Sequence, residues 1–523
     1  MGNTESTPTP LQPPMRAGRR RQTSTSSPTQ SLDEKFDAVR IDHYHPHTSP
    51  LSHSVLSTSD TEHVSGTQTI QYVRDLLKDN KNRLGLSALS TANPSSVLEI
   101  PSAILKDTQN FNLSIPHEGT PVTNQRSSGR CWIFAATNVF RIAIQQKYDI
   151  KNFELSQAYL FFWDKVEKAN YFLTSLLDTA EEYDVDSRLV SALMASPVGD
   201  GGQWDMIVNL VAKYGIVPQT LYPDSWNAQN SSTMDRLLTT KLREDGLKLR
   251  AMRKDGASDV DIADTKEGMM QDVVRILTLC LGPPPAADEK FTWVSLFDVP
   301  PCSSNRSGAN DTQEYTTTKH QVKTASLTPL DFAASTEVKK FISLVNDPRN
   351  PYNRLLTVDH LGNVYDGRPI TYVNVSAQTL KQACVAMLRK GLPIFFGSDV
   401  GKMSDSQKGI MDTALVDYDL GFDVQLEMTK AQRLLTGESQ MTHAMVLTAV
   451  HLDQEGKPVR WRVENSWSVA AGTEGYFVMS DAWMDEFCYQ AVVDPAVVSK
   501  EVRDVLSQKA KVLPLWDPMG ALA

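Results

Sequence analysis

The sequence predicts an α+β fold in which a helical half is followed by a half built on strands. Apolar residues recur at helical spacing in the stretches between residues 131 and 281. Beyond residue 328 the pattern changes to short β-like runs. A polar, glycine-bearing loop over residues 121–130 leads directly into an apolar helical pattern that starts at Cys131. We expect the chain to be organised around this junction.

Composition narrows the class of protein. The 523 residues suffice for two or three domain-sized units, and a hydrophobic fraction of 41% fits a globular protein. The net charge of −10 argues against a general nucleic-acid-binding surface, although a local basic channel remains compatible with it. The five cysteines are odd in number and form no CxxC pair, which indicates free thiols in a reducing compartment. No membrane-spanning run or secretory signal is visible, so we expect a cytoplasmic protein.

Residues 1–66 are predicted to form a disordered tail, because Ser, Thr, Pro, His and Arg dominate it and large apolar residues are few. Its first residues, MGNTES, fit the N-myristoylation pattern on Gly2, and the basic run at 16–21 could supply the second signal that membrane attachment needs. A chance match is the competing interpretation. The Arg- and Ser-rich start also permits a mitochondrial presequence. A membrane-associated or mitochondrial pool therefore stays open beside the cytoplasm.

The helical half is assigned to residues 67–245. Its predicted helices cover residues 67–82, the stretch after Cys131, a stretch capped by Ser156, and residues 205–214.

An insertion is predicted over residues 246–326. It contains a charged amphipathic helix at 260–281, a Gly-Pro-Pro-Pro break, and a polar stretch at 302–326 that we expect to be a mobile loop.

The strand half is assigned to residues 327–510. Its predicted strands cover residues 369–375, 392–396, 442–450, 459–463 and 475–479, which is typical of a small β-barrel.

Cys131 is the first candidate catalytic residue. A thiol at the start of a helix meets unpaired N–H groups and the positive end of the helix dipole, which favour thiolate over thiol. Gln125, six residues upstream, can fold back and offer an N–H beside the backbone N–H of Cys131, where an oxyanion would form. A buried core cysteine is the competing interpretation. The Gln, Gly, Cys and Trp spacing on a loop-to-helix junction favours catalysis.

His443 and Asn465 are the candidate partners of the thiol. A thiolate needs an imidazolium that can protonate the leaving amine, and the imidazole needs an acceptor that fixes its tautomer. His443 opens an apolar strand, and Asn465 follows the next strand within the run NSW, where Trp467 could exclude water above the pair. The alternative is a core histidine whose hydrogen bonds are all made within the fold and which has no catalytic role. The order Cys, His, Asn along the chain favours a triad.

Gln125 and the run GRCW at residues 129–132 resemble the nucleophile segment of papain-like cysteine peptidases. More narrowly, the run QRSSGRCWIF and the C-terminal tail resemble the bleomycin hydrolases, the cytosolic aminopeptidase branch of that family, from residue 67 to the C-terminus. Cys131 and His443 lie more than twice as far apart as the roughly 130–150 residues of simple papain-like enzymes. Large insertions must account for this separation, and bleomycin hydrolases have them.

The resemblance implies a papain-like fold with the active site between a helical half and a β-barrel half. It implies that Gly201 and Gly202 contact the substrate backbone, where a plain turn is the alternative. The tail at 511–523 would lie in the active-site cleft, with the carboxylate of Ala523 bound to the free α-amino group of a substrate. The inserted arm would help to build a homohexamer. No metal and no organic cofactor are expected.

The resemblance further implies a cysteine aminopeptidase that acts on peptides with a free N-terminus. Hydrolysis of a bleomycin amide and of homocysteine thiolactone are expected from the family. Two alternatives stay open: a papain-like endopeptidase whose cleft a mobile tail leaves open, and a hexameric protein that binds single-stranded nucleic acid.

Overall fold

The computed structural model describes residues 66–298, 320–334, 336 and 340–522 of the chain. The chain divides into two compact units, Met1–Asp79 and Asn80–Ala523. The described part of the first unit contains helix α2 (Gly66–Leu76), all of whose residues are exposed. The predicted tail, including the myristoylation pattern at Gly2, lies outside the described residues but for residue 66. All further elements belong to the second unit.

The helix predicted over residues 67–82 is instead two helices, α2 and α3 (Asn80–Leu89). The polar run at 78–83 interrupts the apolar repeat, and the first helix ends before it. The other predicted helices are confirmed: α6 (Cys131–Tyr148), α7 (Gln157–Asp178), α9 (Trp204–Tyr214) and α12 (Asp259–Leu281).

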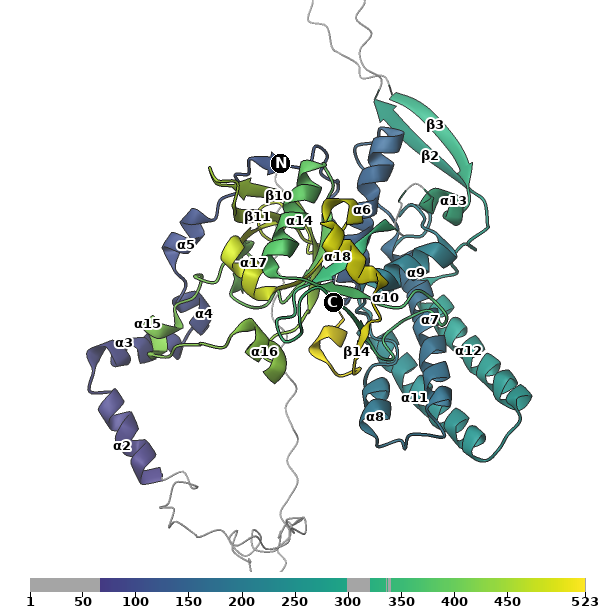
Figure 1. Ribbon diagram of the computed structural model, residues 1–523, viewed down its shortest axis with the longest axis horizontal. Coiled ribbons are helices and arrows are strands. Elements are labelled where there is room, and N and C mark those ends of the chain that lie inside the picture. Colours follow the sequence, from purple (N-terminus) through teal and green to yellow (C-terminus); the bar gives the residue numbers. More distant parts are fainter. Residues whose placement is uncertain (1–65, 299–319, 335, 337–339, 523) are drawn as a thin grey trace, which may run out of the picture. The chain divides into compact units, whose positions relative to one another are not determined.

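Three long helices form the body of the helical part: α7, α11 (Ser232–Lys254) and α12 contact one another pairwise and lie alongside one another in Figure 1. Ser156 caps α7 as predicted, because its hydroxyl oxygen accepts the Tyr159 N–H at 3.1 Å. The bounds of the predicted arm, 246–326, stay a prediction.

Twelve of the described strands form one sheet in the order β14-β5-β6-β4-β13-β7-β10-β11-β12-β9-β8, with β1 paired to β10. These strands are β1 (Leu113–Ser114), β4 (Ile342–Val345), β5 (Arg354–Val358), β6 (Tyr372–Asn374), β7 (Ile394–Ser398), β8 (Ser404–Asp405), β9 (Ile410–Met411), β10 (His443–Leu452), β11 (Pro458–Glu464), β12 (Tyr476–Ser480), β13 (Cys488–Val493) and β14 (Lys511–Leu513). The predicted α+β class is confirmed, with strands at each of the five predicted places.

The polar stretch at 302–326 is not a loop throughout. Residues 320–326 belong to β3 (His320–Leu327), which pairs antiparallel with β2 (Phe291–Asp298) from Phe291↔Leu327 to Asp298↔His320. The strand was missed because its sequence is mostly polar, so the β-like alternation is weak there. Residues 302–319 lie outside the described residues.

The remaining elements are short or cover the sheet. They are α4 (Pro94–Val97), α5 (Pro101–Lys106), α8 (Arg188–Ala195), α10 (Trp226–Gln229), α13 (Pro329–Ala333), α14 (Ala377–Arg389), α15 (Tyr418–Phe422), α16 (Lys430–Thr436), α17 (Asp481–Phe487), α18 (Lys500–Asp504) and the 3₁₀ turns Pro495–Val497, Val505–Ser507 and Pro518–Gly520.

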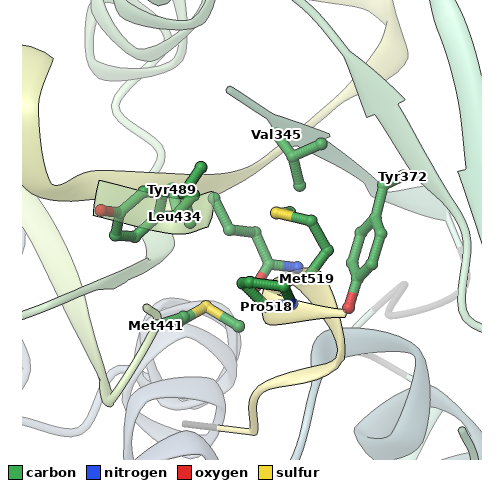
Figure 2. Close-up of a pocket in the computed structure, with 8 residues that line it drawn as sticks. Val345, Tyr372, Leu434, Met441, Tyr489, Pro518 and Met519 are labelled. Atoms are coloured by element: carbon green, nitrogen blue, oxygen red, sulfur yellow. The ribbon is translucent and has the colours of Figure 1, made fainter. Parts of the chain in front are cut away.

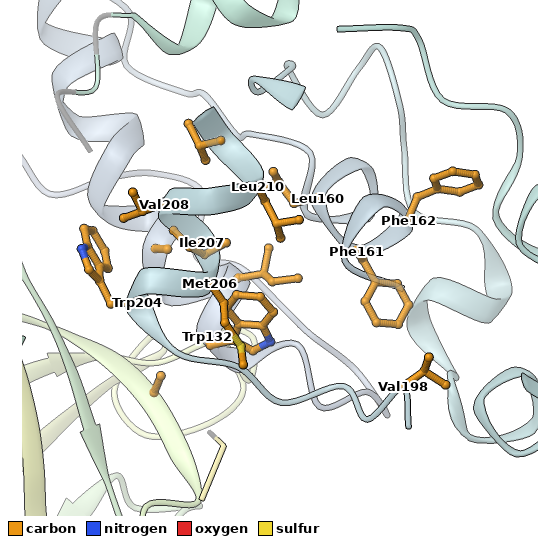
Figure 3. Close-up of a cluster of buried hydrophobic side chains, with 14 of the residues drawn as sticks. Trp132, Leu160, Phe161, Phe162, Val198, Trp204, Met206, Ile207, Val208 and Leu210 are labelled. Carbon is orange, nitrogen blue, oxygen red and sulfur yellow. The ribbon is translucent and has the colours of Figure 1, made fainter. Parts of the chain in front are cut away.

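One buried apolar cluster joins the helices to the sheet, and Figure 3 shows part of it around Trp132 and Trp204. Trp204 is 5.6 Å from Phe140 of α6 and 5.4 Å from Phe395 of β7, measured between ring centroids. Aromatic contacts of this kind add to the area that they bury. Trp204 therefore fixes the start of α9 against both α6 and the sheet.

The strand pairing also sets where the predicted triad residues lie. Strands β10 and β11 run antiparallel with Val446 opposite Glu464, so the first residue of β10 comes to the end of β11. His443 is that first residue, and Asn465 directly follows β11. Helix α6 packs against β10. The fold thus gathers Cys131, His443 and Asn465 from three separate parts of the chain.

Candidate active site

Cys131 is the first residue of α6 and is 2% exposed. The preceding residue, Arg130, is fully buried, and its guanidinium makes two 2.9 Å hydrogen bonds to the Asp224 carboxylate. Arg130 also donates to the Ser128 hydroxyl at 2.9 Å. Its side chain makes no cap on α6, so the N–H groups of the first turn are not taken by it. Arg130 therefore fixes the loop while leaving the helix start available.

The environment of the Cys131 sulfur differs from the expectation of a thiolate. Burial raises the pKa of this thiol to about 11, although the backbone N–H groups of Ala444, Trp132 and Cys131 itself act in the opposite direction. Desolvation thus outweighs the helix start that the sequence analysis relied on. The contact with the Ala444 N–H also places the sulfur beside the residue that follows His443.

His443 is 4% exposed, and its Nε2 lies 2.8 Å from the Asn465 Oδ1. An amide oxygen can only accept, so Nε2 carries the proton, and Nδ1 is the basic nitrogen of the neutral ring. Burial lowers the pKa of His443 to about 4, although the hydrogen bond to Asn465 acts in the opposite direction. Trp467 lies against the ring at a centroid distance of 4.7 Å and an interplanar angle of 30°. Burial thus favours the neutral form of the imidazole, as it does that of the thiol.

The Gln125 side chain is held from both ends of its amide. Its Oε1 accepts the Ser466 hydroxyl at 2.7 Å, and its Nε2 donates to the Ser128 carbonyl at 2.7 Å. The Gln125 backbone N–H donates to the Ser466 carbonyl at 2.9 Å. A primary amide has two N–H groups, so one of them is left for a ligand.

Gly202 lies against the ring of Trp132, the residue that follows Cys131. A Cβ at position 202 would come within 2.3 Å of the Trp132 ring, so only glycine fits there. The Trp132 indole N–H donates to the Asp200 carbonyl at 2.7 Å, and Lys168 donates to the Gly201 carbonyl at 2.7 Å. The glycine segment is thus fixed next to Cys131 by packing and by two hydrogen bonds.

Sequence reasoning missed Asp200, whose carboxylate ties the glycine segment to the loop before Cys131. It accepts the Gly129 N–H at 2.8 Å and the Ser231 hydroxyl at 2.5 Å, and it pairs with Lys165 at 2.6 Å. Burial alone would raise the pKa of Asp200, but Lys165 and the donors hold it well below its usual range. The only local signal was its place directly before the two glycines.

The C-terminal tail is anchored at several points before it reaches the site. Strand β14 pairs parallel with β5, and Asp517 forms a 2.7 Å ion pair with Arg349. Figure 2 shows Met519 among Val345, Tyr372 and Met441, in a pocket that the tail itself helps to line.

Beyond this pocket, the Gln203 Nε2 donates to the Ala521 carbonyl at 2.8 Å. Leu522 packs against the large apolar cluster that contains Trp132. Ala523, with the predicted carboxylate, lies outside the described residues. The tail therefore reaches the residue next to Gly202.

The described residues contain no group of three or more His, Cys, Asp or Glu side chains that could hold a metal ion. Among the same residues, no helix combines the length and the apolar character needed to cross a bilayer.

The Peptidase C1-like family matches residues 63–520 of this chain. Bleomycin hydrolase of Rattus norvegicus is 44% identical over 425 residues, which are 79% of this chain and 88% of the relative. "Cysteine proteinase 1, mitochondrial" of Saccharomyces cerevisiae (strain ATCC 204508 / S288c) is 40% identical over 462 residues, 86% of this chain and 91% of the relative.

Among solved structures, PepW from Lactobacillus rhamnosis superimposes with a TM-score of 0.81 at 40% identity, covering 88% of this chain and 99% of that one. The predicted resemblance to bleomycin hydrolases is thereby confirmed. The chain belongs to the Peptidase C1-like family and is a cysteine peptidase.

Proposed function

We propose that this cysteine peptidase is an aminopeptidase of the bleomycin hydrolase type, which releases residues from peptides with a free N-terminus. The observation that carries the proposal is the position of the tail: Ala521 is bound by Gln203, directly after the glycines expected to contact substrate. A tail held at this point would leave room for only a short part of a substrate on one side of Cys131. The name of the rat relative supports the same assignment.

In the proposed acylation, Cys131 starts as a neutral thiol and His443 as a neutral imidazole. The Cys131 sulfur attacks the carbonyl carbon as its proton passes to the Nδ1 of His443, which Asn465 has left as the basic nitrogen. The carbonyl oxygen becomes an oxyanion, and the free N–H of Gln125 and the backbone N–H of Cys131 stabilise it. When the C–N bond breaks, the imidazolium gives its proton to the departing amine. A thioester on Cys131 remains.

Deacylation repeats these steps with water. The neutral imidazole takes a proton from a water molecule that attacks the thioester carbon, and the same donors stabilise the second oxyanion. Collapse releases a carboxylic acid, and the imidazolium returns its proton to the sulfur. Trp467, which lies against the His443 ring, would limit water at this pair before substrate binds.

The tail supplies the specificity in this proposal. The carboxylate of Ala523 would pair with the α-ammonium of a substrate, and a blocked N-terminus would meet the chain end instead. A bleomycin amide and homocysteine thiolactone both place a carbonyl beside a free α-amino group, so the same attack would serve these expected family substrates.

We expect the full-length enzyme to cleave a fluorogenic amino-acid amide with a free α-amino group about 10- to 100-fold faster, in kcat/KM, than its N-acetylated twin. This range corresponds to one hydrogen bond to a charged group. Removing residues 520–523 should abolish the preference and raise turnover of the acetylated substrate. Met519 would stay in its pocket, so the anchored part of the tail is kept.

Cys131→Ala is the control, and it should turn over neither substrate. Equal cleavage of both substrates by the full-length enzyme would instead indicate an endopeptidase. Failure to cleave either would remove the proposed activity and favour a binding role.

The pH profiles of the two substrates should differ. Below pH about 4, His443 is protonated and cannot accept the thiol proton, so kcat/KM should rise with pH through that value for both substrates. An α-amino group loses its proton near pH 8, which would end its pairing with the tail. The free-amine substrate should show an alkaline loss there, whereas the acetylated substrate with the truncated chain should not. If both substrates lost kcat/KM near pH 8, the loss would belong to a group of the enzyme. That result would contradict the pairing of the tail with the α-amino group of the substrate.

We also propose that the enzyme forms a homo-oligomer, a hexamer by resemblance. Exposed apolar side chains on α11 and α12 support an assembly, since such groups favour burial between chains. They are Leu237, Leu247, Val260 and Leu279. Sedimentation equilibrium should give about six times the chain mass of 58.1 kDa, and a monomer mass would contradict the proposal.

For location, we propose the cytoplasm with a mitochondrial or membrane-associated pool. The name of the yeast relative, a mitochondrial cysteine proteinase, supports the mitochondrial pool. Cell fractionation tests it: loss of the membrane-bound fraction in Gly2→Ala would indicate lipidation, and a purely soluble cytosolic enzyme would exclude both minor pools.

A further inference from the structure

We propose that Gln203 is a specificity-determining residue that latches the C-terminal tail and so controls how often the cleft opens to peptides with a blocked N-terminus. The inference rests on the tail-gated activity proposed above and assigns its control to one side chain. Its basis is the 2.8 Å hydrogen bond from the Gln203 Nε2 to the Ala521 carbonyl.

The Gln203 side chain starts from a rigid point. Its exposed fraction is 0%, and its backbone carbonyl accepts the Met206 N–H at 3.0 Å as α9 begins. Gly202 on one side is packed on the Trp132 ring, and Trp204 on the other is held by Phe140 and Phe395. Because both neighbours are fixed, the backbone from which the Gln203 side chain extends toward the tail is fixed as well.

The last described residues of the tail, Ala521 and Leu522, depend on this contact more than the earlier part of the tail does. The earlier part is held by the pairing of β14 with β5, by the ion pair of Asp517 and by the burial of Met519. Among the described residues, no other hydrogen bond joins Ala521 or Leu522 to the helices, since the Ala521 N–H bonds within the tail to Pro518 at 3.1 Å. Leu522 adds an apolar contact, which has no preferred direction. Among the described residues, Gln203 thus supplies the directional contact between the last part of the tail and the helices.

The size of the effect follows from the net strength of one buried hydrogen bond, which corresponds to about a 2- to 10-fold change in an equilibrium. A blocked substrate binds only when the tail has left, so its kcat/KM follows the fraction of open enzyme. The free-amine substrate uses the closed form, which remains dominant. Weakening the contact between Gln203 and the tail should therefore raise kcat/KM for the blocked substrate and leave kcat/KM for the free-amine substrate nearly unchanged.

The test measures kcat/KM for the free-amine amide and its N-acetylated twin in Gln203→Leu and in Gln203→Asn. Leucine cannot donate, and asparagine is one methylene too short. Gln157→Leu is the matched control, because Gln157 is also buried in the helical part and donates to Thr137 at 3.2 Å, away from the tail. Titration of Cys131 with an alkylating reagent normalises every variant to its folded sites.

Each Gln203 variant should turn over the acetylated substrate about 2- to 10-fold faster, with the free-amine activity changed less than 2-fold. Gln157→Leu should change both substrates by the same factor. In the chain that lacks residues 520–523, Gln203→Leu should have no further effect on the ratio, because its partner is gone.

Three results separate the possible failures. If truncation opens the site to the acetylated substrate but the Gln203 variants do not, the latch is wrong and the tail gate stands. If Gln203→Leu shifts the ratio equally with and without the tail, Gln203 acts on substrate directly and the latch is also wrong. If truncation itself changes nothing, the proposed function fails.

Discussion

The segment from Glu464 to Trp467 holds the site together, because its successive side chains reach different parts of it. Glu464 forms a buried ion pair with Arg141 of α6, and Asn465 holds His443. Ser466 holds the Gln125 amide, and Trp467 lies on the imidazole ring. The four residues follow one another at the end of β11. Consequently the position of one strand end fixes α6, His443 and Gln125 relative to one another.

Burial determines the resting state of this site. The thiol and the imidazole are both shifted toward their neutral forms, to pKa values of about 11 and about 4, because desolvation penalises each charge. A neutral pair needs only one proton transfer when a carbonyl arrives, and the N–H donors then meet charge where it develops. Water exclusion therefore suits the proposed chemistry and protects the sulfur between turnovers. The tail bound at Gln203 would contribute to that exclusion.

Local sequence pattern was enough to predict the fold class and to single out Cys131, Gln125, His443 and Asn465. Each stands in a short, recognisable motif at or near the start or the end of a predicted helix or strand. Asp200, Ser466 and Gln203 could not be found in this way. They are ordinary polar residues whose meaning comes from partners far along the chain: Gly129, Gln125 and Ala521. The thiolate at Cys131 stays a prediction, since a helix start is visible in a sequence and the burial that raises the pKa of the thiol is not.

The most direct measurement is kcat for Ser466→Ala, with Gln125→Ala and the double variant completing the cycle. Gln125→Ala should cost on the order of 100- to 1000-fold, as loss of one oxyanion donor does. Ser466→Ala should cost about 10-fold, with no added loss in the Gln125→Ala background, because its hydroxyl acts through that amide. Alkylation of Cys131, which forms no oxyanion, should keep its rate. Full additivity of the two losses, or equal slowing of alkylation, would contradict the role assigned to this segment.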